Sequence, residues 1–161
     1  MRYRLIVLLL ILPAVLSAQP LAVRLEQASD NAEQISNQLL SQPPTTLSSE
    51  DWLVLAEAQL RLSKKEAAMD AVSHVLRQDE PPYLQAYGYL LKAQIYGILY
   101  RDTAIAITQL EQAEQLLQHA TDTDSLALYS DVLQNFAQAY NQLGNIAKAI
   151  PYAERSLALA L

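Results

Sequence analysis

The chain has 161 residues, which is enough for one domain of ordinary size with its own core. Hydrophobic residues make up 52% and charged residues 17% of the chain, which excludes wholesale disorder. The net charge of −6 argues against nucleic acid or an anionic lipid surface as a partner, and the absence of cysteine excludes disulfides and thiol chemistry.

Residues 1–18 have the pattern of a secretory signal peptide. Two arginines near the start are followed by an apolar run from Leu5 to Leu16 and by the small residues Ser17 and Ala18, after either of which cleavage fits the pattern. An uncleaved anchor is the alternative, but the run is shorter than the roughly 20 residues that a membrane-spanning helix needs. We therefore expect secretion across an inner membrane to the periplasm, with no membrane span in the mature chain.

Apolar residues recur every three or four positions through the rest of the chain, which places them on one face of a helix. Prolines and cap-forming polar residues interrupt this pattern, and no segment shows the alternation typical of a strand. The sequence therefore predicts an all-α domain of about seven helices. In chain order they are expected at Leu21 to Leu40, Ser48 to Leu62, Ser63 to Arg77, Tyr83 to Tyr100, Asp102 to His119, Ser125 to Leu143 and Ile146 to Leu161.

These helices divide into a leading helix with a linker, residues 19–47, and three pairs, at about 48–80, 81–120 and 123–161. The pairs share an order of small and large residues. Small residues let the two helices of a pair approach closely, and large ones fill the space against the neighbouring pair. The copies are Trp52, Leu55, Ala56, Gln59, Ala68, Val72 and Pro81; then Leu90, Ala93 and Tyr96, with Ala106, Leu110 and Ala113 after one inserted residue; then Leu133, Phe136, Ala137, Tyr140, Gly144, Ala149, Ala153 and Ser156.

This pattern resembles the tetratricopeptide repeat over about Glu50 to Leu161, and the resemblance implies a right-handed superhelix of antiparallel helix pairs. The alanines Ala56, Ala93 and Ala137 are 37 and 44 residues apart, whereas the family period is 34, so we expect longer helices or connections in the later copies. Pro151 should remove one backbone hydrogen bond from the last helix. A generic helical bundle with chance alanine spacing is the alternative, and it is all-α as well.

No residue set in the sequence has the pattern of an active site, a cofactor site or a metal site. His74 and His119 lie far apart without paired-ligand spacing, and the chain has no G-x-S-x-G elbow or glycine-rich phosphate loop. Asp122 and Asp124 resemble half a calcium loop, but its glycine and distal glutamate are missing, so we expect helix capping there. We therefore expect no catalysis, no cofactor and no bound metal.

The resemblance implies that the first helix of each pair lines a concave groove for a protein or peptide ligand. Leu53 and Glu57 stand where the family's clamp for a terminal carboxylate needs Lys and Asn, so that specificity is not expected. For the glutamine-rich face of the third copy, simple solubility is the alternative. The expected groove residues are Leu53, Glu57, Leu60, Arg61, Tyr87, Leu90, Gln94, Ile98, Gln134, Gln138, Asn141 and Gln142.

Two functions are compatible with this pattern. One is an exported, non-catalytic scaffold that binds a protein or peptide. The other is the extracytoplasmic input region of a bacterial membrane signalling protein, which the order of signal peptide, leading helix and repeats resembles, with a diguanylate cyclase or histidine kinase domain beyond residue 161. Leu157, Leu159 and Leu161 have no following helix to cover them, so either the natural chain continues or a second copy packs there and forms a homo-oligomer.

Overall fold

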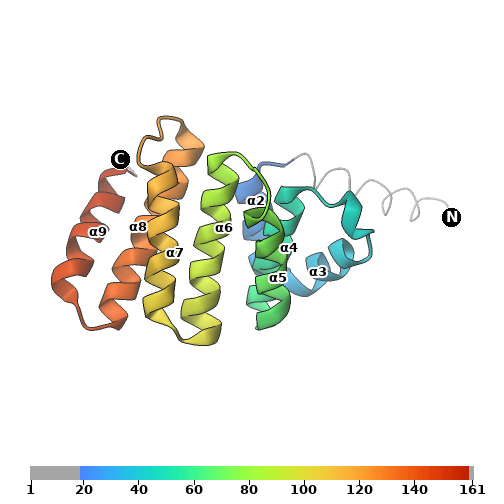
Figure 1. Ribbon diagram of the computed structural model, residues 1–161, viewed down its shortest axis with the longest axis horizontal. Coiled ribbons are helices and arrows are strands. Elements are labelled where there is room, and N and C mark those ends of the chain that lie inside the picture. Colours follow the sequence, from blue (N-terminus) through green and yellow to red (C-terminus); the bar gives the residue numbers. More distant parts are fainter. Residues whose placement is uncertain (1–18, 160–161) are drawn as a thin grey trace, which may run out of the picture.

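The computed structural model describes residues 19–159, and all regular structure in that range is helical. The predicted signal peptide lies outside the described residues. The helices form one row in which neighbours from α4 onward run in opposite directions (Figure 1). The all-α prediction is confirmed for these residues. The elements are α2 (Leu21–Asp30), α3 (Ala32–Leu40), a 3-10 turn (Pro44–Thr46), α4 (Ser49–Arg61), α5 (Lys65–Leu76), α6 (Pro82–Gln94), a π-helical segment (Ile95–Tyr100), α7 (Thr103–Leu117), α8 (Thr123–Gln142) and α9 (Ile146–Leu159).

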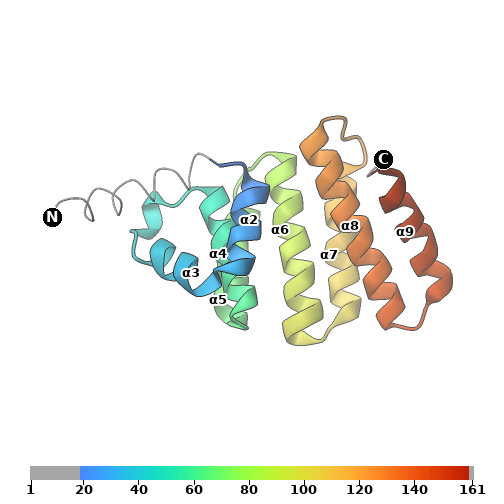
Figure 2. The same ribbon diagram turned by 180° about the vertical axis from the view of Figure 1, so that it is seen from behind.

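The leading segment differs from the single helix that the sequence predicts. Asn31, at φ −126° and ψ 42°, leaves helical geometry and separates α2 from α3. Asparagine side chains compete with helical backbone bonding, but Asn31 is a much weaker sequence signal than proline or glycine. Both short helices pack against α4, so the leading segment covers the first pair instead of extending away from it (Figure 2).

The three pairs are α4 with α5, α6 with α7 and α8 with α9, and each pair packs against the next. Small residues mark the close contacts. At Gly88 of α6 an added Cβ would lie 2.8 Å from Cδ2 of Leu76, so α5 and α6 meet where glycine leaves room. In the third pair, the ring of the fully buried Phe136 stacks on Tyr152 with ring centroids 4.5 Å apart.

Side-chain caps fix where several helices begin. Ser48 and Asp51 form a capping box at the start of α4: the Asp51 backbone N–H donates to the Ser48 hydroxyl, and the Ser48 backbone N–H donates to the Asp51 carboxylate. Asp102 accepts from the backbone N–H of Ile105 at 3.0 Å, and Asp122 accepts from that of Ser125 at 2.8 Å. The bond from Ser125 confirms the predicted capping by Asp122, and hydrogen bonds from Ser125 lower the pKa of its carboxyl group.

Longer helices in the later pairs account for the long repeat spacing: α4 has 13 residues, whereas α6 has 13 and continues for 6 more as the π-helical segment, and α8 has 20. After Gln94, helix α6 continues as the π-helical segment and ends at Arg101, whose φ of 59° turns the chain into α7. The inserted residue of the second copy is taken up in this wider turn. Gly144, at φ 71°, makes the tight turn between α8 and α9, and α9 continues through Pro151. Among residues 19–159, no helix combines the length and the apolar character needed to cross a bilayer.

Candidate functional site

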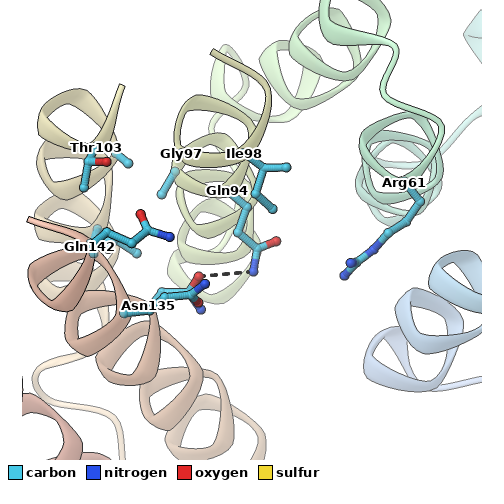
Figure 3. Close-up of a pocket in the computed structure, with 12 residues that line it drawn as sticks. Arg61, Gln94, Gly97, Ile98, Thr103, Asn135 and Gln142 are labelled. Atoms are coloured by element: carbon cyan, nitrogen blue, oxygen red, sulfur yellow. Dashed lines mark hydrogen bonds between the residues drawn. The ribbon is translucent and has the colours of Figure 1, made fainter. Parts of the chain in front are cut away.

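Two adjoining hollows lie along the first helices of the pairs. The first has a volume of about 280 Å³ and lies between α6 and α8, with α7 behind them and Arg61 of α4 at its edge (Figure 3). Most of its lining is small or polar, so ligand atoms could come close to the helices. It is lined by Arg61, Ala93, Gln94, Gly97, Ile98, Thr103, Ala106, Leu110, Asn135, Gln138, Ala139 and Gln142.

Side-chain amides dominate the polar surface of the first hollow. Gln94 Nε2 donates to Asn135 Oδ1 at 3.4 Å, and Asn135 Nδ2 donates to the backbone carbonyl of Asp131 at 2.9 Å (Figure 3). Gln138 and Gln142 are exposed on the same side of α8. An amide offers both donors and an acceptor, so this surface can bond to both polar groups of a peptide backbone.

The second hollow, of about 400 Å³, lies between α2 and the helices α6 and α8. It shares Arg61, Gln94 and Asn135 with the first hollow, so the two form one continuous groove, called the groove below. Four carboxyl groups line it against one guanidinium group, so its local charge is negative. The lining is Ala22, Leu25, Glu26, Ser29, Asp30, Glu57, Arg61, Tyr87, Leu90, Leu91, Gln94, Asp131 and Asn135.

Burial shapes the chemistry of the groove's ionisable groups. The Glu57 side chain is 7% exposed and accepts a hydrogen bond from Arg61 Nε at 2.7 Å, so each neutralises the other. Asp131 is exposed, but the surrounding groove partly desolvates its carboxyl group and raises its pKa, and it makes no ion pair with a described residue. Burial, with the neighbouring Tyr83 and the Asp131 carboxylate, also raises the pKa of Tyr87, so its hydroxyl keeps its proton at neutral pH.

Most of the residues predicted to line a groove do lie together. They come from α4, from α6 and its π-helical extension, and from α8, helices that contribute to the same groove although they are far apart in the sequence. The structure brings together Glu57, Arg61, Tyr87, Leu90, Gln94, Ile98, Gln138 and Gln142.

Four residues predicted to line the groove lie outside it. Leu53 and Leu60 are 0% and 3% exposed, because α2 and α3 pack against α4 and bury that part of its surface. Gln134 lies beside Leu157 in a shallow hollow between α8 and α9. Asn141 is exposed but lines neither part of the groove.

Sequence reasoning missed several groove residues. Asp131 and Asn135 precede Gln138 and Gln142 at spacings of four, three and four, which is a single helical stripe and was a usable signal. The α2 residues had no comparable signal, because their place in the groove depends on how the leading segment folds back onto α4.

Outside the groove, the acidic and histidine side chains of the described residues form no candidate metal site. No three His, Asp or Glu side chains of residues 19–159 converge as metal ligands. His74 is exposed and stacks on Trp52, with ring centroids 4.0 Å apart and planes 8° from parallel. This stack joins α5 to α4 within the first pair.

Comparison with known proteins agrees with this architecture. Residues 130–161, which contain α9 and most of α8, match the family model described as the tetratricopeptide repeat. This match supports the tetratricopeptide-repeat family predicted from the sequence, over the third predicted copy. No curated protein and no solved structure gives a significant match to the chain. Such repeats suggest a protein–protein interaction module, and proteins of this family are typically non-catalytic.

Proposed function

We propose that this tetratricopeptide-repeat chain is an exported, non-catalytic module that holds a peptide or protein segment in the groove. The observation that carries the proposal is the convergence of α4, α6 and α8 on one continuous groove lined by side-chain amides. Export rests on the signal-peptide pattern of residues 1–18.

The chemistry of the groove indicates how a segment is held. Gln138 and Gln142 are exposed and can donate to and accept from a peptide backbone. Ile98, which is 48% exposed, offers an apolar contact for a ligand side chain beside them. The carboxyl groups of the second hollow disfavour an acidic segment there, because like charges repel.

A peptide-display selection against the full chain tests the proposal. Fluorescence anisotropy then measures the affinity of the selected peptide for Gln138→Ala in the groove and for Gln115→Ala, the same change at an exposed position of α7. Because Gln138→Ala removes about one hydrogen bond, we expect it to weaken binding by about 2- to 12-fold. We expect Gln115→Ala to have no effect. If no peptide is selected, or if both variants bind alike, groove binding is refuted.

The outer face of α9 supports a second activity, self-association. Ile146, Ile150 and Leu157 form one stripe on this helix and are 51%, 50% and 63% exposed. Leu159, predicted to be uncovered, is half-buried, and Leu161 lies outside the described residues. We propose that a second copy covers this stripe, because it is an exposed apolar surface. It lies on the second helix of its pair, and in the two earlier pairs that helix packs against the first helix of the next pair.

Sedimentation velocity over a range of concentrations tests this second proposal. We expect a dimer that Ile150→Glu dissociates, because a carboxylate would be buried in an apolar contact. Gln115→Glu adds the same charge to an exposed position of α7 and should leave the dimer intact. A chain that stays monomeric at every concentration contradicts self-association.

A further inference from the structure

Helix α2 lies over the part of the groove that belongs to the first pair. Glu50, Leu53 and Glu57 share one face of α4, since they are spaced by three and four residues. Both ends of this stripe meet α2: Glu50 pairs with Arg24 at 3.1 Å, and Glu57 lines the same hollow as residues of α2. Leu53, between them, is 0% exposed, and α2 runs alongside α4 (Figure 2).

The contacts that hold α2 in place are few. It has ten residues, and Pro20 at its start provides no side-chain cap. Its buried residues are Leu21, Arg24 and Ala28, so it buries only one large aliphatic side chain completely. Isolated helices of this length are only marginally stable in water, so α2 depends on its packing against α4. By contrast, α4 has a capping box and eight consecutive buried residues.

Arg24, which is 2% exposed, makes the main polar contacts between α2 and α4. It donates to Glu50 and Asp51 at the start of α4, where the helix dipole is positive. Its Nε finds no hydrogen-bond partner among the described residues, and neither does Oε1 of Gln27 in the same helix. Because one nitrogen of this buried guanidinium makes no hydrogen bond, part of its desolvation cost is not offset by its two ion pairs.

We propose that α2 is a displaceable cover: it undocks from α4 while the three pairs stay folded, and it thereby exposes Leu53 beside Glu57, which already lines the groove. The consequence rests on the proposed groove function. Segments that gate binding sites are drawn from the least stable parts of a fold, which fits the few contacts of α2. A ligand that needs the open state binds with an affinity reduced by the fraction of chains that are open.

Thiol labelling measures the opening directly, because the chain has no cysteine and an introduced one is its only thiol. Leu53→Cys places the thiol beneath α2, and Val72→Cys, equally buried in α5, reports global unfolding. We expect Leu53→Cys to react roughly tenfold faster or more, because local opening precedes global unfolding. Equal rates for the two thiols overturn the proposal.

Substituting Arg24 tests whether its ion pairs hold α2 on α4, with the same substitution at an exposed arginine as the control. Arg24→Gln should raise the labelling rate at Leu53→Cys by roughly a hundredfold, because it leaves two carboxylates without their partner. Because it destabilises the docked state relative to the fully unfolded chain as well, it should raise the rate at Val72→Cys by no more than the same factor, and Leu53→Cys should remain the faster of the two thiols. Arg77→Gln makes the same change at an exposed arginine that has no ion pair with a described residue, and it should alter neither rate. If Arg24→Gln leaves the rate at Leu53→Cys unchanged, or if the two thiols react equally fast in its presence, the proposal is overturned.

Hydrogen exchange measures the same opening on the unsubstituted chain, so it tests the proposal even if Leu53→Cys does not fold. The amides of α2 should exchange roughly tenfold faster or more than those of α4, and equal protection overturns the proposal. The selected peptide should bind Arg24→Gln more tightly than Arg77→Gln, and equal affinity overturns the gating of the groove. If no peptide is selected while the labelling rates are as predicted, only the proposed function fails.

Discussion

Phe136→Ala tests how the third pair is held together. The Phe136 side chain is 0% exposed and stacks on the ring of Tyr152 from α9. Its truncation should cost about 3–5 kcal/mol of unfolding free energy, because a buried phenyl ring is lost and a cavity remains. That is a large share of the roughly 5–15 kcal/mol available to a domain. Leu143→Ala, on a side chain that is 56% exposed, should cost about 0.5 kcal/mol or less.

Urea unfolding followed by two probes measures the size of the effect and where it acts. Far-ultraviolet circular dichroism reports all helices, whereas Trp52, the only tryptophan, reports the first pair. Helix α8 packs mainly on the second pair and α9 packs on α8, so in Phe136→Ala part of the dichroism should be lost before the fluorescence changes. A loss below about 1 kcal/mol would refute the packing argument. A fluorescence midpoint that falls as far as the dichroism midpoint would refute the locality.

Two further changes test a turn and a helix start. Gly144→Ala should destabilise the chain by about 1–2 kcal/mol, because its φ of 71° is unfavourable for a residue with a Cβ. No heavy atom lies within 4 Å of the added Cβ, so this backbone strain is the whole effect. A thermal melt with an unchanged midpoint would contradict this. Burial alone would raise the pKa of Asp51, but hydrogen bonds from Ser48 and the ion pair with Arg24 outweigh it and lower the pKa below its ordinary 3.8. The resulting stability is present above pH 3.8 and is lost as the pH falls through the lowered pKa, so Asp51→Asn should lose less stability than the unsubstituted chain between pH 5 and pH 2, measured by urea midpoints. Equal losses in the two chains would contradict the assignment.

The sequence predicts the parts of the fold that depend on local signals. Asp102 and Asp122 mark helix starts because a short side chain caps the following backbone N–H groups. Gly144 marks the last turn because its φ of 71° suits glycine. These interactions span only a few residues, so a single sequence is enough to detect them.

The rest depends on contacts between distant segments. The burial of Leu53 and Leu60 follows from the packing of α2 and α3 on α4, which no local pattern specifies. The break at Asn31 is of the same kind, since the residue is compatible with a helix and leaves it only as the leading segment folds back. The groove residues of α8, by contrast, can be predicted from helical spacing. A stripe at intervals of three and four residues through Gln138 and Gln142 includes Asn135 and excludes Gln134.

A nuclear magnetic resonance titration of the full chain with the selected peptide tests the central claim most directly. The side-chain amide signals of Gln94, Gln138 and Gln142 report the groove, and the methyl signals of Ile150 and Leu157 report the outer face of α9. If the groove is the binding site, the amide signals shift with the peptide concentration and the α9 methyl signals stay in place. Shifts confined to the α9 methyl signals would contradict the account.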